Sequence, residues 1–162
     1  MNTHTLLMPV ILTLSLGGTG CNRKDPAPTP RRAPLAAPTH VPATTMNIRV
    51  NIGDKTLAAT LADNPTARDF ASLLPLTLTM NDLFGREKYA RLPRAMSDGG
   101  KREYTYEAGQ IIYWSPGPDV AIYYKDDGAK IPEPGIIVLG KVDAGVEALN
   151  VPGSVRVTIT RD

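Results

Sequence analysis

The sequence has few of the side chains that most often carry catalysis or bind metals. Its one cysteine is Cys21, its two histidines are His4 and His40, and all three precede Thr45. Residues 46–162 therefore contain no thiolate and no imidazole, and a single cysteine excludes a disulfide within the chain. These absences exclude most zinc, copper and iron sites and most Ser–His or Cys–His nucleophiles. We expect no metal and no cofactor in this chain.

A charge excess is also missing from the larger part of the chain. The 162 residues contain 18 basic and 16 acidic side chains, and residues 1–45 hold four of the basic and only one of the acidic ones. Residues 46–162 are therefore close to neutral, which gives no electrostatic argument for an acidic polymer. We expect no nucleic-acid partner.

No apolar run is long enough for a helix that spans a bilayer. The longest N-terminal run, Leu6–Leu16, has 11 residues, which suits the apolar region of a secretory signal peptide. Small residues then lead to Cys21, in a pattern that resembles the cleavage site of bacterial lipoproteins. This predicts a signal peptide over residues 1–20 and a lipid on Cys21 that anchors the protein in the cell envelope, facing the periplasm or the outer surface. The alternatives are a buried apolar strand with an incidental cysteine, or a true start at Met46.

Residues 21–45 predict a lipid-anchored, disordered Pro/Ala-rich tether. Asn22 to Thr45 contains six prolines and no aromatic residue that could build a core. Such a composition favours a polyproline II spacer, and a ligand for a proline-binding module is the weaker alternative. The membrane contact is then expected through the lipid on Cys21 only.

Residues 46–162 predict one mostly β domain. Alternating apolar residues indicate a hairpin over 48–61 with a turn at Gly53-Asp54, and the pair Asn64-Pro65 begins a short amphipathic helix that ends before Pro75. Residues 81–102 lack periodicity and predict a long loop, or a loop that carries a short helix. Further strands are expected at 76–80, 104–106, 111–115, 120–124, 136–142 and 155–159. About eight strands with one or two short capping helices favour a closed β-barrel, because closure removes exposed edges.

Three segments of this domain resemble the cyclophilin-like fold family of small bacterial proteins, which is distinct from the prolyl isomerases that share its barrel. They are Asn81–Pro93, Gly109–Gly117 running into Val120–Tyr124, and Gly135–Val142. Gln110 stands where the family tends to have an acidic residue, and Tyr123 where it tends to have Phe. The chain has no stretch like the Phe-His-Arg and Gln-Gly-Gly-Asp segments of the isomerases. The resemblance therefore implies a cyclophilin-like barrel and adds little support for isomerase activity.

A basic cluster between residues 86 and 102 is the main candidate for a ligand site. Arg86 and Arg91 could hold an anion or a peptide carboxylate at the barrel mouth, although a solvated charged loop explains the same pattern. In the aromatic run 113–124, alternate residues should point into the core and toward a pocket. No catalytic residue is assigned. The predicted ligand-binding residues are Asn81, Arg86, Glu87, Lys88, Arg91, Tyr113 and Tyr123.

These features favour a binding module for a peptide or a small anionic ligand, without covalent or metal catalysis. The alternative is a peptidyl-prolyl cis/trans isomerase, because that reaction needs only an apolar pocket and a hydrogen-bond donor. Arg86 or Arg91 would be the donor, and Phe84, Met80 or Tyr113 the pocket. A hydrolase that uses carboxylates alone is a third alternative, and the oligomeric state is left open.

Overall fold

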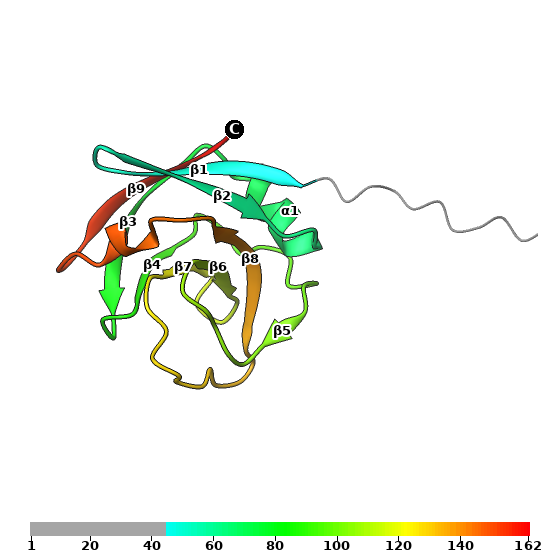
Figure 1. Ribbon diagram of the computed structural model, residues 1–162. Coiled ribbons are helices and arrows are strands. Elements are labelled where there is room, and N and C mark those ends of the chain that lie inside the picture. Colours follow the sequence, from blue (N-terminus) through cyan, green and yellow to red (C-terminus); the bar gives the residue numbers. More distant parts are fainter. Residues whose placement is uncertain (1–44) are drawn as a thin grey trace, which may run out of the picture. The chain divides into compact units, whose positions relative to one another are not determined.

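The computed structural model describes residues 45–162, which form the β domain in Figure 1. The predicted signal peptide, Cys21 and the Pro-rich tether lie outside the described residues. The nine strands are β1 (Met46–Ile52), β2 (Lys55–Leu61), β3 (Leu76–Leu83), β4 (Glu87–Arg91), β5 (Arg102–Glu103), β6 (Gln110–Trp114), β7 (Asp119–Tyr123), β8 (Ile136–Val142) and β9 (Val155–Arg161). In the described part of the chain, no helix is long and apolar enough to cross a membrane.

Eight of the strands close into an antiparallel barrel, as the sequence predicts. Their order is β2-β1-β9-β3-β4-β7-β6-β8, and pairing of β8 with β2 joins the two ends of this row. The closing register runs from Ala59 opposite Val142 to Leu61 opposite Gly140. The short β5 pairs only with the beginning of β8. Closure leaves the barrel without a long unpaired edge, so its backbone hydrogen bonds are made internally.

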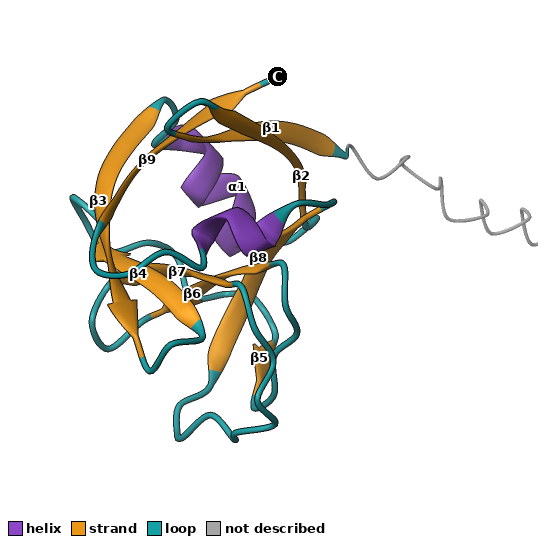
Figure 2. Ribbon diagram, turned by 60° about the vertical axis from the view of Figure 1, so that its left-hand side comes forward, coloured by secondary structure: helices purple, strands orange, loops and turns teal. Residues whose placement is uncertain are grey.

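Helix α1 (Pro65–Ser72) covers one end of the barrel. Asn64 is its N-cap and accepts a hydrogen bond from the Ala67 amide at 2.8 Å, and Pro65 occupies the first turn, where its missing N–H has no cost. The helix buries Phe70 and Ala71 in the main core. Figure 2 shows α1 inside the outline of the strand ring. A 3-10 helix, η1 (Val146–Leu149), precedes β9.

The barrel wall made by β4, β7, β6 and β8 is buried on both of its faces. In β6, Ile111 belongs to the interior core and the next residue, Ile112, to a second apolar cluster. In β7, Val120 belongs to the interior core, and Ala121 and Tyr123 belong to the second cluster. Successive side chains of a strand point to opposite faces, so the second cluster lies on the outer face of this wall. Tyr106, Ile131 and Ile136 complete it. The outer face is therefore covered by the segment after β5, which contains Tyr106, and by the segment after β7, which contains Ile131.

Two expectations for the elements are wrong. Residues 87–91 form strand β4 within the expected loop 81–102, and residues 104–106 are not a strand, because β5 ends at Glu103. β4 lacks an apolar alternation because the charged Glu87 and Lys88 are both buried, on opposite faces of the wall. Tyr106 is buried by stacking on Tyr123 and has no strand partner. The pattern does not predict β4 because its buried side chains are charged. It wrongly predicts a strand at residues 104–106 because Tyr106 is buried by stacking and not by pairing in a sheet.

Candidate functional site

A pocket of about 290 Å³ lies on the outer face of the barrel wall, and not at the barrel mouth, where the basic cluster predicts a ligand. Ala121 forms its floor. In the register of the sheet, Ala121 stands between Tyr89 of β4 and Ile112 of β6, so a methyl group is surrounded by much larger side chains. The lining residues are Leu83, Phe84, Arg86, Glu87, Tyr89, Ile112, Trp114, Asp119, Ala121, Tyr123, Ile131, Pro132 and Ile136. Ten of these thirteen are uncharged, which makes the pocket mainly apolar.

One end of the pocket is polar and is formed by Arg86. Its Nε lies 3.6 Å from Oε1 of Glu87, and its Nη1 lies 3.4 Å from Oδ2 of Asp127. Both contacts are at or beyond the limit of a good hydrogen bond. Within residues 45–162, the buried Nε of Arg86 has no hydrogen-bond acceptor, although the side chain is only 14% exposed. The site thus holds a buried donor that a ligand oxygen could satisfy.

Glu87 and Tyr123 lie opposite each other in neighbouring strands. Burial raises the pKa of Glu87, and this is opposed by the Tyr123 hydroxyl and by Arg86. Burial also raises the pKa of Tyr123, and the Glu87 carboxyl adds to this. The Tyr106 ring stacks on Tyr123 with centroids 3.9 Å apart and an interplanar angle of 15°. The polar end is therefore a rigid, largely dry arrangement with fixed side chains.

Phe84 forms the rim of the pocket in an unfavourable backbone conformation. Phe84 and Gly85 have φ values of 57° and 64°, and the Arg86 amide donates to the Leu83 carbonyl at 3.3 Å, so the turn between β3 and β4 has two left-handed central residues, as a type I′ turn does. This left-handed region suits Asn or Gly and is costly for a bulky residue. Phe84 is nevertheless 74% exposed, and the Arg86 guanidinium lies 4.9 Å from its ring centroid. An exposed aromatic side chain held under strain beside a pocket is a feature of a binding site.

The segment between β7 and β8 forms the opposite rim. The hydroxyl of Tyr106 donates to Oδ1 of Asp127, and the Ile131 amide donates to the Tyr104 carbonyl at 3.0 Å. The carbonyl of Arg86 accepts from the Tyr124 amide at 2.9 Å. These bonds tie both ends of the segment to its surroundings and hold Ile131 and Pro132 against the pocket.

Three of the predicted ligand-binding residues meet at this pocket: Arg86, Glu87 and Tyr123. Two others lie apart from it at the surface. Asn81 is exposed and accepts from the Ser154 hydroxyl at 2.7 Å. Arg91 is 72% exposed and does not line the pocket, although its Nε lies 3.6 Å from Asp119, which does.

The two remaining predicted residues point into the barrel. Lys88 is fully buried and donates to Oδ1 of Asp82 at 2.9 Å and to the carbonyls of Val151 and Gly153. Tyr113 belongs to the interior core, and its hydroxyl accepts from the Met96 amide at 3.1 Å. Lys88 follows Glu87 and Tyr113 follows Ile112, and both preceding residues line the pocket. Since successive side chains of a strand point to opposite faces, Lys88 and Tyr113 lie on the face away from the pocket. Their polar atoms are satisfied internally, which makes them structural residues.

The basic cluster of the sequence does not form a common positive surface. Each of its six members has a carboxylate partner within 4 Å, so its charge is balanced locally. The pairs are Arg86–Glu87, Lys88–Asp82, Arg91–Asp119, Arg94–Asp69, Lys101–Glu103 and Arg102–Asp98. Among residues 45–162, no group of three acidic, histidine or cysteine side chains is arranged to hold a metal ion.

Comparison with known proteins gives a family for this domain. Residues 50–160, which include every residue of the pocket, match the sequence model of the cyclophilin-like family. The chain belongs to the cyclophilin-like family. This confirms the family resemblance that the three segments indicated. A search of curated proteins gave no match.

The cyclophilin-like domain is also similar to a solved structure, that of a hypothetical protein from Archaeoglobus fulgidus studied in solution. The TM-score is 0.53 and the identity 18%, and the match covers 76% of this chain and 99% of the archaeal one. Identity at this level shows a common fold alone.

Proposed function

We propose that this cyclophilin-like domain binds an apolar segment of a peptide in the pocket over Ala121, without covalent or metal chemistry. The observation that carries the proposal is the buried Nε of Arg86, which has no acceptor within the described residues and lies at one end of an apolar pocket. A peptide supplies both features that this arrangement can recognise: an apolar side chain for the walls, and a carbonyl oxygen for the donor.

An uncharged carbonyl suits Arg86 better than an anion does. The guanidinium is already shared by two carboxyl groups, those of Glu87 at 3.6 Å and Asp127 at 3.4 Å. A ligand carboxylate would have to approach these two groups inside a poorly solvated pocket, where repulsion between like charges is strong. The peptide is therefore the favoured member of the two ligand classes that the sequence suggests.

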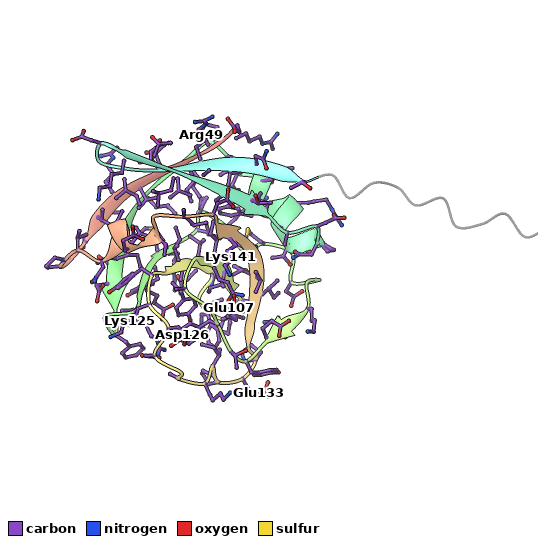
Figure 3. The ribbon with its side chains drawn as sticks, in the orientation of Figure 1. Arg49, Glu107, Lys125, Asp126, Glu133 and Lys141 are labelled. Carbon is purple, nitrogen blue, oxygen red and sulfur yellow. The ribbon has the colours of Figure 1, made fainter. Side chains whose placement is uncertain are left out.

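Trp114 provides the measurement, because it lines the pocket and is the only tryptophan in the chain. Blocked peptides that contain Pro, Leu or Phe between polar residues are titrated against the full chain while the fluorescence of Trp114 is recorded. We expect saturable binding that weakens at least tenfold in Arg86→Met, which removes the donor, and in Ala121→Leu, which fills the floor. The control is Arg49→Met, on the other side of the barrel in β1 and exposed in Figure 3.

Two results would overturn this proposal. The first is the absence of a saturable signal with every peptide up to millimolar concentration. The second is equal affinity of the wild type, Arg86→Met and Ala121→Leu. Circular dichroism of each variant ensures that only folded protein is compared.

Peptidyl-prolyl isomerase activity is the second candidate, favoured by the same donor beside an apolar wall. Arg86 would donate to the twisted amide and Phe84 would contact the proline, whereas Met80 and Tyr113 lie in the interior core. The test is the isomerisation rate of a proline peptide with and without the protein. The uncatalysed reaction takes tens to hundreds of seconds, so a rate that does not rise with protein concentration would count against the enzyme.

We further propose that the domain is displayed on the cell envelope through a lipid on Cys21, supported by the apolar run Leu6–Leu16 and the small residues before Cys21. The mass of the mature protein purified from membranes tests this. A diacylglyceryl or triacyl mass on Cys21 that is lost in Cys21→Ala supports the anchor. An unmodified chain that begins near Met46 contradicts it.

A further inference from the structure

The end of the pocket opposite Arg86 is formed by a carboxylate beside an indole ring. Asp119 of β7 is paired with Trp114 of β6 in the sheet register, and both line the pocket. A Cβ atom placed on Gly117 would collide with Oδ2 of Asp119 and would lie 3.3 Å from Cδ1 of Trp114. The carboxylate and the edge of the indole therefore lie side by side over Gly117, and the carboxylate occupies the space that the missing side chain of Gly117 leaves.

Asp119 is weakly engaged by the rest of the protein. Its side chain is 18% exposed, and the distance from its Oδ1 to Nε of Arg91 is 3.6 Å, which is too long for a hydrogen bond. Arg91 itself is 72% exposed, and surface pairs of this kind contribute little to stability. A ligand cation could therefore take the place of Arg91 beside this carboxylate at little cost.

Charge and spacing within the pocket both favour a cation at this end. Of the two carboxylates that line the pocket, Glu87 lies beside Arg86, so Asp119 is the one at this end. Figure 3 shows Lys125, Asp126 and Glu133 on the loop that follows β7, and Asp127 of the same loop is paired with Arg86. Asp119 and Tyr123 are four residues apart in β7, which corresponds to about 13 Å along a strand. The pocket thus has a hydrogen-bond donor at one end, an apolar floor in the middle and an acceptor at the other end.

We propose that the ligand is a peptide with a lysine or arginine side chain whose cationic group lies between Asp119 and Trp114. The inference rests on the proposed peptide-binding function and specifies its ligand. A carboxylate supplies charge-assisted hydrogen bonds to ammonium or guanidinium, and tryptophan is the best aromatic partner for a cation. Tyr89, which also lines the pocket, adds a second ring from β4. The apolar neighbour of the cationic residue then occupies the floor over Ala121, and its carbonyl accepts from Arg86.

Three peptides that differ at one position test this inference in the full chain. They carry arginine, its uncharged isostere citrulline, or glutamate, next to the same apolar residue, and binding is followed by Trp114 fluorescence and calorimetry. We expect the arginine peptide to bind about five- to tenfold more tightly than the citrulline peptide, and the glutamate peptide to bind most weakly. The preference should shrink as salt is raised, because the cation site is partly exposed.

Two variants locate the cation. Asp119→Asn should bring the affinities for the arginine and citrulline peptides to within a factor of two of each other, while the affinity for citrulline stays at the wild-type value. Unchanged citrulline binding also shows that the variant is folded. Arg91→Met removes the competing side chain, so it should keep or strengthen the preference for arginine.

Equal binding of the arginine and citrulline peptides to the wild type would overturn the cation site while leaving the peptide-binding pocket intact. A preference for arginine that persists in Asp119→Asn would place the cation elsewhere and would also overturn it. If none of the three peptides binds, the proposed function itself fails.

Discussion

At the scale of single residues, Phe84 combines a cost to folding with a place at the pocket. A bulky residue in the left-handed region costs about 1 kcal/mol, and type I′ turns prefer Asn-Gly. We predict that Phe84→Asn raises the free energy of unfolding by about 0.5–1 kcal/mol, since the exposed ring buries little surface, and weakens peptide binding severalfold. Urea unfolding and Trp114 fluorescence titration measure the two effects.

Gly85→Ala is the matched control for this turn. Gly85 has a φ of 64°, and a Cβ there would meet no atom within 4 Å, so only backbone strain is added. We expect a loss of about 1 kcal/mol in stability with no change in peptide affinity. A Phe84→Asn variant that is less stable than the wild type would contradict the assignment of strain to Phe84.

Glu87 makes stability depend on pH in a definite direction. Burial raises its pKa in the folded state above the value of 4.5 expected in the unfolded chain. The folded state then binds this proton more tightly, so the stabilising contribution is complete below pH 4.5 and is lost as pH rises through the folded pKa. The prediction is that the stability of the wild type relative to Glu87→Gln falls as pH rises from about 4 toward 7. Urea unfolding at several pH values measures this, and parallel curves for the two proteins would refute it.

At the scale of the elements, local patterns predicted most strands and the helix, because their signals lie within a few residues. Asn64 and Pro65 mark the start of α1, and the alternation around Gly53 marks the first hairpin. Strand β4 was not predicted because its buried positions include the charged residues Glu87 and Lys88. The burial of both depends on partners far away in the sequence. A strand with polar residues at its buried positions can be recognised only when the strands that pair with it are known.

The site was only partly predictable for the same reason. Arg86, Glu87 and Tyr123, which line the candidate pocket, could be predicted as candidates because charged and aromatic side chains are common in binding sites. Ala121 carries no local signal, since a small residue becomes the floor of a pocket only when Tyr89 and Ile112 are placed on either side of it. Register between strands is non-local information, and it decides which side chains share a face.

Lys88 links β4 to the segment before β9, and we predict that its loss damages the fold but not the site. In Lys88→Met, the carbonyls of Val151 and Gly153 lose their donor, and Asp82 loses its cation. Removing one partner from such a buried arrangement costs about 3 kcal/mol. The folded variant should bind peptide with unchanged affinity, because Nζ lies on the inner face. Urea unfolding combined with Trp114 titration separates the two readouts.

Lys141→Met serves as the comparison, since Lys141 is an exposed residue that is paired with Glu107. Its effect on stability should stay within about 0.5 kcal/mol. A Lys88→Met variant with a similarly small effect would show that the buried ammonium group is not the link between β4 and the β9 segment.

At the scale of the whole molecule, barrel closure depends on a single small residue in the seam between β2 and β8. A Cβ on Gly140 would collide with the Thr60 carbonyl oxygen and would lie 3.0 Å from Cα of Leu61. Because both contacts are with backbone, the strands themselves would have to separate. Only glycine lets the first hairpin pair with the strand that also borders the pocket wall.

We therefore predict that Gly140→Ala lowers the free energy of unfolding by about 2 kcal/mol or more, as overpacking at a fixed backbone does. Amide hydrogen exchange should become faster in β2 and in the end of β8, because those bonds would open locally before global unfolding. Gly99→Ala is the control, since a Cβ there has its nearest neighbours at 3.6 Å and should change stability by less than about 0.5 kcal/mol. If the seam amides in Gly140→Ala remain as protected as those of the wild type, close backbone contact is not what closes this barrel.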